Sequence, residues 1–133
     1  MKILIAEDNF VQRKLLISQL SSLGEVDIAA NGKEAVMAVE LAVDEHEPYD
    51  LIFLDIMMPE NDGIQALIKI RKLEAQLGLA HKTRSKIIML TALSDKDNVV
   101  AAARHNCDSY LIKPATKPRL LEAIREVGLE AQG

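Results

Sequence analysis

The chain has 133 residues, of which 49% are hydrophobic, and this is enough for one compact domain with a core that needs no disulfides. Its 16 Lys and Arg against 20 Asp and Glu give a net charge of −4, which argues against broad nucleic-acid binding. Cys107 is the single cysteine, so an internal disulfide is excluded. The apolar stretch at residues 3–6 is too short for a signal peptide or a membrane span, and we expect a cytoplasmic protein.

The first quarter of the chain predicts a strand, a helix and a second strand. Residues 3–6 form an apolar β-type run, and residues 10–22 follow with a helical period that ends near Gly24. Residues 25–29 are a weaker strand candidate. The side chains of the helix that we expect to face the core are Val11, Leu15, Leu20 and Leu23.

The middle of the chain repeats this alternation. After an Asn31-Gly32 turn, residues 33–44 predict a helix, and Pro48 precedes the strand at residues 51–55. Residues 62–77 predict the next helix. The expected core-facing residues of the two helices are Ala35, Val36, Val39 and Ala42 in the first, and Ile64, Leu67, Ile68 and Leu73 in the second.

The last part predicts two more strands and two more helices. The strands are residues 86–91 and 108–113, and the helices run from a cap at Ser94 or Asp95 to about residue 105 and over about residues 117–127. The segment from residue 64 to residue 86 predicts a longer third helix or an extended loop. Strands joined by helices of this length favour an α/β fold with a parallel sheet covered on both faces.

Polar residues stand where four of the predicted strands end. They are Glu7 and Asp8 after the first strand, Asp55 at the end of the third, Thr91 at the end of the fourth and Lys113 at the end of the fifth. Ligands of such sheets bind beyond the carboxyl ends of the strands. We therefore expect three carboxylates, one hydroxyl and one ammonium group to converge on one edge.

This set of groups indicates phosphoryl chemistry. Clustered carboxylates repel one another unless a cation lies among them, and an all-oxygen set suits Mg²⁺. Lys113 and Thr91 beside the acids fit an anion, because the ammonium can neutralise one phosphoryl oxygen and the hydroxyl can donate to another. Asp55 is then the natural nucleophile and would form an acyl phosphate.

With these residues in this order, the sequence resembles the receiver domains of two-component response regulators, in the manner of the chemotaxis response regulators. The resemblance covers essentially the whole chain, residues 1–133, as one domain without an output domain, and it implies a flavodoxin-like sheet of strand order 2-1-3-4-5. The motifs that carry it are Glu7-Asp8, Asp55 with Met58-Pro59 and Asp62-Gly63, Thr91-Ala92, Tyr110 and Lys113-Pro114.

The resemblance implies a role for each residue of the acidic site. Asp55 would accept a phosphoryl group from a phosphohistidine on a histidine kinase or a histidine phosphotransfer protein, with Thr91 and Lys113 assisting. Asp8, Asp55 and the backbone carbonyl of Met57 would bind Mg²⁺ directly. Glu7 would bind the same ion through a water molecule.

The resemblance also implies a switch and an output surface. Thr91 and Tyr110 would form the switch pair, and a cis peptide would join Lys113 to Pro114. The sequence holds no helix-turn-helix segment and no basic recognition surface, so we expect no direct DNA binding. A stand-alone receiver would then be read by a partner protein or by dimerisation, through the face that spans residues 95–127.

Three departures from the family pattern carry expectations of their own. Glu7 stands where the family more often has Asp, which lengthens the reach to the metal. Ala115 follows Lys113-Pro114 where many receivers have Phe, which bears on the start of the last helix. Met57 and Leu93 occupy the positions, two after Asp55 and two after Thr91, where faster receivers hold the hydrolytic water with polar side chains, so we expect a long-lived phosphorylated state.

Other interpretations stay open at this point. Glu7, Asp8 and Asp55 could each be a loop or capping acid, and Tyr110 could be a fixed half-buried ring. The chain could be a receiver-like adaptor that never takes phosphate, although an adaptor has no need of clustered acids. A phosphatase of the dehalogenase type would need a second Asp two residues after the nucleophile, and Met57 occupies that place.

Overall fold

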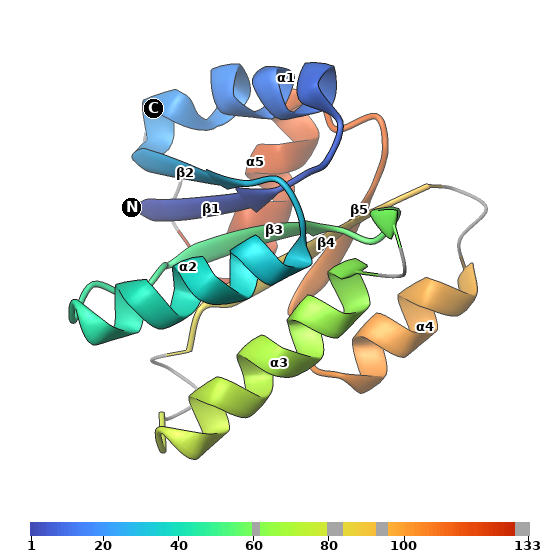
Figure 1. Cartoon of the computed structure of the whole chain (residues 1–133). Helices are drawn as coiled ribbons and strands as arrows, with labels where there is room; N and C mark the ends of the chain where they lie inside the picture. The colour runs from blue at the N-terminus through green and yellow to red at the C-terminus, as the bar shows by residue number, and fades with distance from the viewer. Residues whose placement is uncertain (60–61, 80–83, 93–95, 130–133) are drawn as a thin grey trace.

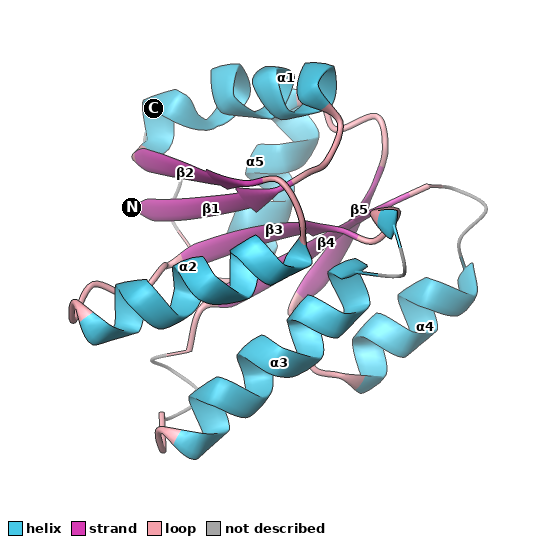
Figure 2. Cartoon of the chain, viewed as in Figure 1, coloured by secondary structure: helices cyan, strands magenta, loops and turns pink. Residues whose placement is uncertain are grey.

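The computed structural model describes residues 1–59, 62–79, 84–92 and 96–129, and within them it shows five parallel strands with helices on both faces (Figures 1 and 2). The strand order is β2-β1-β3-β4-β5, which confirms the flavodoxin-like prediction. The strands are β1 (Lys2–Ala6), β2 (Glu25–Ala29), β3 (Leu51–Asp55), β4 (Lys86–Thr91) and β5 (Ser109–Ile112). The helices are α1 (Phe10–Leu20), the 3₁₀ turn η1 (Ser21–Leu23), α2 (Gly32–Asp44), α3 (Asp62–Gln76), α4 (Lys96–Arg104) and α5 (Lys117–Glu126).

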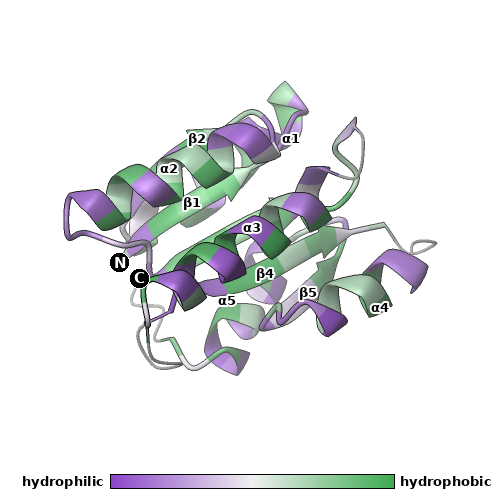
Figure 3. Ribbon diagram, turned by 60° about the horizontal axis from the view of Figure 1, so that its bottom comes forward, coloured by the Kyte–Doolittle hydropathy of each residue, from purple (hydrophilic) through white to green (hydrophobic). Residues whose placement is uncertain are grey.

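The sheet separates two apolar layers. Helices α1 and α5 cover one face, and α2, α3 and α4 cover the other (Figure 1). Central strand β3 is buried along its whole length, with Leu51 and Phe53 in the layer of α1 and α5 and Ile52 and Leu54 in the other. A strand buried on both faces has a continuous apolar run in its sequence, and residues 51–54 form such a run. Figure 3 shows strands β1 and β4 in the colour of hydrophobic residues.

Helix α1 differs from its prediction. Leu20 and Leu23 are buried as expected, but Val11 and Leu15 are 72% and 54% exposed, and Leu16 takes the core position instead. The α-helix ends at Leu20, and the next three residues form a 3₁₀ turn, so the helical period is not continued to residue 22. The helix therefore leaves part of its apolar surface on the outside of the molecule.

Helix α3 also turns a different face inward. Ile64 and Leu67 are buried as expected and Leu73 packs against the core, but Ile68 is 37% exposed and Ile70 is buried in its place. Two charged residues of the same helix, Arg71 and Glu74, are buried as an ion pair. The third helix has 15 residues.

The remaining boundaries agree with the sequence within one or two residues. Asn31 caps α2, since its side chain accepts a hydrogen bond from the backbone N–H of Glu34 at 2.8 Å. The predicted caps of α4, Ser94 and Asp95, lie outside the described residues. No helix within the described part of the chain combines the length and the apolar character that crossing a membrane requires.

Candidate phosphoacceptor site

The strand ends bring the predicted residues to one edge of the sheet. Backbone hydrogen bonds continue the ladders just past the strands: the N–H of Glu7 donates to Ala29, that of Ile56 to Leu90 and that of Lys113 to Thr91, at 3.1, 2.9 and 2.8 Å. These bonds fix the backbone beside each polar side chain. The site therefore stands on a rigid part of the fold, which is the usual support for reactive groups.

Lys113 contacts two of the three acids. Its Nζ donates to Asp55 Oδ2 at 2.7 Å and to Glu7 Oε2 at 3.3 Å, and both carboxylates are nearly inaccessible to solvent. A third bond runs from Nζ to Oε1 of Gln12 at 2.7 Å. One ammonium group thus neutralises part of the charge of a buried carboxylate pair.

The acids form a cluster fit for a divalent cation. Glu7, Asp8 and Asp55 each place one carboxylate oxygen within 4.8 Å of the others, and Asp8 is exposed to solvent. Burial, followed by a hydrogen bond with Asp55 and its charge, raises the pKa of Glu7 to about 8, against the opposing effect of Lys113. Burial and the neighbouring Asp55 outweigh the single ammonium group of Lys113, and a hard divalent ion would add the positive charge that favours the ionised carboxylate.

The backbone around Asp55 orients its carboxylate. The N–H of Met57 donates to Asp55 Oδ1 at 2.9 Å, while Lys113 holds the other oxygen. The Met57 side chain is 58% exposed and takes no part in this contact. Gly63, in the first turn of α3, packs directly on the carbonyl of Asp55, where a Cβ atom would overlap the oxygen. A glycine is therefore required at this point of the chain.

Thr91 and Tyr110 lie on the neighbouring strands β4 and β5. Thr91 is fully buried at the end of β4, and its Oγ1 donates to the carbonyl of Ala92 at 3.2 Å. Tyr110 is 49% exposed. A pocket of about 380 Å³ between β4, β5 and α4 is lined by both residues. The peptide between Lys113 and Pro114 is cis.

Three supporting contacts were missed by the sequence reasoning. One is the bond from Lys113 to Gln12, and another is the packing of Gly63 on Asp55. The third joins α2 to α3, because the N–H of Gly32 donates to Oδ2 of Asp62 at 2.6 Å. The two Gly residues were visible as turn signals, but no local signal links positions 12 and 113.

Fold and site together define a class of protein: a doubly wound α/β domain with an aspartate, two further acids and a lysine at the carboxyl edge of its sheet. A family model described as "Response regulator receiver domain" matches residues 3–125. The chain belongs to the response regulator receiver domain family.

The most similar proteins include short and long relatives. Chemotaxis protein CheY of Halobacterium salinarum is 34% identical over 126 residues, which are 95% of this chain and 95% of that protein. Probable histidine kinase 2 of Oryza sativa subsp. indica is also 34% identical, over 96% of this chain. The chain spans only 13% of the length of that kinase.

Solved structures show the same fold. The receiver domain of Ssk1 from Saccharomyces cerevisiae, crystallised with the histidine phosphotransfer protein Ypd1, matches with a TM-score of 0.80 and 32% identity over 96% of this chain and 88% of that one. The receiver domain of the histidine kinase CKI1 from Arabidopsis thaliana, complexed with Mg²⁺ and BeF₃⁻, matches with a TM-score of 0.79 and 29% identity over 95% and 88%.

Proposed function

We propose that the chain is a Mg²⁺-dependent phosphoacceptor of two-component signalling and that Asp55 receives the phosphoryl group. The observation that carries this proposal is the contact of Lys113 Nζ with Asp55 Oδ2 at 2.7 Å beside two further acids. A buried carboxylate held from one side by an ammonium group and from the other by a backbone N–H is positioned for attack on phosphorus. Residues 1–133 are proposed to form one receiver domain.

The acids fit Mg²⁺ as a bound ion. Asp8, Asp55 and the backbone carbonyl of Met57 would hold it directly, and Glu7 would hold it through water. The ion would offset negative charge on the phosphoryl oxygens. A single lysine serves the cluster, and the exposed Asp8 adds a carboxylate that Lys113 does not contact, so the site keeps oxygen ligands for a cation.

In the transfer step, a carboxylate oxygen of Asp55 forms a bond to phosphorus as the bond from phosphorus to the donor imidazole nitrogen breaks. The electron pair of that bond stays on the imidazole, which takes up a proton from solvent. The Lys113 ammonium group moves from the carboxylate to the phosphoryl oxygens, where the negative charge then lies. The Thr91 hydroxyl exchanges its bond to Ala92 for one to the phosphoryl group.

The switch is proposed to pass from Thr91 to Tyr110. Both residues line the pocket beside α4, so a shift of the Thr91 side chain changes the space available to the exposed Tyr110 ring. The phosphorylated state would then present an altered surface over residues 95–127 to a partner protein or to a second copy of the chain. This is a population shift within one fold.

The partners are proposed from the kinds of relatives. The phosphodonor would be a histidine kinase or a histidine phosphotransfer protein, as in the solved complex of Ssk1 with Ypd1. The receiver would not be an enzyme in the ordinary sense, although it would phosphorylate itself from small donors and lose the group slowly. The protein is proposed to be cytoplasmic and to be a monomer or to dimerise on phosphorylation. It is proposed to contact neither DNA nor a membrane directly.

The test is incubation with acetyl phosphate and Mg²⁺, followed by intact-mass measurement over time. We expect one added phosphoryl group, none in Asp55→Asn and none without Mg²⁺. Asp50→Asn, which removes an exposed carboxylate at the opposite end of β3, is the matched control and should be phosphorylated like the wild type. Absence of an adduct from acetyl phosphate and phosphoramidate alike, together with no Mg²⁺ binding, would favour the phosphorylation-independent adaptor.

A further inference from the structure

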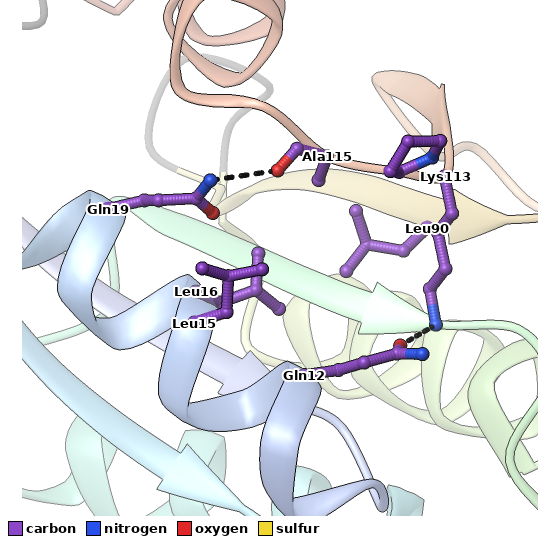
Figure 4. Close-up of a pocket in the computed structure, with 8 residues that line it drawn as sticks. Gln12, Leu15, Leu16, Gln19, Leu90, Lys113 and Ala115 are labelled. Atoms are coloured by element: carbon purple, nitrogen blue, oxygen red, sulfur yellow. Dashed lines mark hydrogen bonds between the residues drawn. The ribbon is translucent and has the colours of Figure 1, made fainter.

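A pocket of about 300 Å³ lies between α1 and the loop that joins β5 to α5 (Figure 4). Most of its wall is apolar and comes from Leu15, Leu16, Leu90, Pro114 and Ala115. Ala115 contributes only a methyl group to this wall. The volume is at the lower end of the range for small-molecule sites, which are mostly apolar with a few placed polar groups.

One polar group that lines this pocket is the amide of Gln19. Its Nε2 donates to the carbonyl of Ala115 at 3.0 Å, and this bond fixes which end of the amide is nitrogen, since a carbonyl can only accept. Oε1 is buried and has no hydrogen-bond partner among the described residues. Figure 4 shows it on the side of Leu16, toward the pocket. A buried acceptor without a partner costs free energy that a donor would recover.

The mouth of the pocket is connected to the phosphoacceptor. Gln12 and Lys113 both line it, and Lys113 Nζ donates to Gln12 Oε1 at 2.7 Å (Figure 4). The same Nζ donates to Asp55 Oδ2 at 2.7 Å. A molecule that fills the pocket therefore packs against the side chain that must move toward an incoming phosphoryl group.

We propose that this pocket binds a compact, largely apolar molecule that carries one hydrogen-bond donor, and that the donor bonds to Gln19 Oε1. The bound molecule restrains Lys113 and slows phosphorylation of Asp55. The binding site stands on the pocket and the unpaired acceptor alone, whereas the effect on phosphorylation rests on the function proposed above.

Indole and benzofuran are the probes, because the two have nearly the same shape and only indole has an N–H donor. Two-dimensional NMR of the ¹⁵N-labelled full chain should show saturable shifts at Leu15, Gln19 and Ala115 with indole. Benzofuran should bind between about 5-fold and 100-fold more weakly, the range expected when a buried acceptor stays unpaired. Equal affinities for the two probes, or shifts away from the pocket, would overturn the proposal.

Variants test the roles of the Gln19 acceptor and of the apolar pocket wall separately. Gln19→Leu should abolish the preference for indole, because it removes the acceptor. Ala115→Phe should fill the pocket and prevent binding of both probes, and its NMR spectrum reports whether it folds. Ser18→Ala is the matched control, because Ser18 is an exposed neighbour in α1 that does not line the pocket.

The effect on phosphorylation is measured with acetyl phosphate. The initial rate should fall with the same dependence on indole concentration as the NMR shifts. An unchanged rate at saturating indole would overturn the coupling. Asp55→Asn cannot be phosphorylated under the proposed function but should bind indole like the wild type, so a failure of the phosphoacceptor proposal and a failure of the pocket proposal give different results.

Discussion

Gly63 lies against the backbone carbonyl of Asp55, and no side chain fits between the start of α3 and the end of β3 at this contact. The contact sets how closely α3 approaches the phosphoacceptor. Since the helix covers the sheet face beside the site, a change at Gly63 acts on the position of the Asp55 backbone and not on its side-chain chemistry.

Gly63→Ala should therefore reduce both stability and Mg²⁺ affinity. Overpacking against a backbone atom is expected to cost about 1–3 kcal/mol in urea unfolding. Gly78→Ala is the control, because it adds the same methyl group where no atom lies within 4 Å, although its positive φ carries about 1–2 kcal/mol of strain. If the two variants bound Mg²⁺ equally well, the positioning role of Gly63 would be refuted.

Mg²⁺ binding should depend on pH through Glu7. Its pKa of about 8 means that the metal-free protein holds a proton near Asp55, Asp8 and Lys113 at pH 7, and cation binding must release it. Calorimetry should show the Mg²⁺ affinity rising by up to about tenfold per pH unit below pH 8 and levelling off above it. Glu7→Gln should lose this slope, and a slope that survived in Glu7→Gln would assign the proton elsewhere.

The raised pKa of Glu7 also determines how the stability of the metal-free protein changes with pH. The pKa of Glu7 in the folded protein, about 8, lies above its ordinary value of 4.5 in the unfolded chain, so folding favours the protonated carboxyl. The contribution of Glu7 is fully present below about pH 4.5 and is lost as the pH rises toward 8. Urea unfolding without Mg²⁺ should show that the free energy of unfolding falls less across this pH range in Glu7→Gln than in the wild type.

Loss of the phosphoryl group should be slow because neither Met57 nor Leu93 can hold a water molecule by hydrogen bonds. Met57 is exposed beside Asp55, and Leu93 lies outside the described residues. The double variant Met57→Asn with Leu93→Glu should lose the group faster, as followed by intact mass after removal of the donor. Met37→Asn is the control, since Met37 is exposed to the same extent on α2, and a double variant no faster than this control would disprove the explanation.

The buried Arg71 holds three parts of the chain together. Its guanidinium bonds to Glu74 at 2.7 Å, to Asp108 at 2.6 Å and to the carbonyl of Ser85 at 2.8 Å. Arg71→Met should cost about 3–5 kcal/mol, because it leaves the buried Glu74 and the partly buried Asp108 without a counter-charge. Arg104→Met, at an exposed position in the last turn of α4, should change urea unfolding by less than about 0.5 kcal/mol. Similar costs for the two variants would show that the network adds nothing to stability.

Much of the fold was predictable because its strands are short apolar runs between helical segments of clear period. The polar residues at the strand ends could be grouped because parallel strands share one edge. The inward face of α1 could not be predicted, because two apolar rows at spacing i, i+4 compete for it. One row is Val11 and Leu15, and the other is Leu16 and Leu20. Only the position of the helix on the sheet decides between these rows.

Contacts between side chains that are distant in the chain could not be predicted from the sequence either. Gln12 and Lys113 are 101 residues apart, and nothing in the local pattern of either segment pairs them. Charged residues are rarely buried unless paired, and no local pattern marks Arg71 and Glu74 as a buried pair. Asp108, the second acidic partner of Arg71, follows a turn that brings the end of α4 back to the sheet.

The site draws on positions 7, 55, 91 and 113, each at the end of a different strand or just beyond it. A chain that ended after β4 would keep three acids and lose the ammonium group that contacts two of them. Their mutual repulsion would then oppose collapse of the sheet edge. During synthesis, the three acids are therefore made before Lys113 and lack its positive charge until β5 is complete. A divalent cation bound in that interval would supply the missing positive charge.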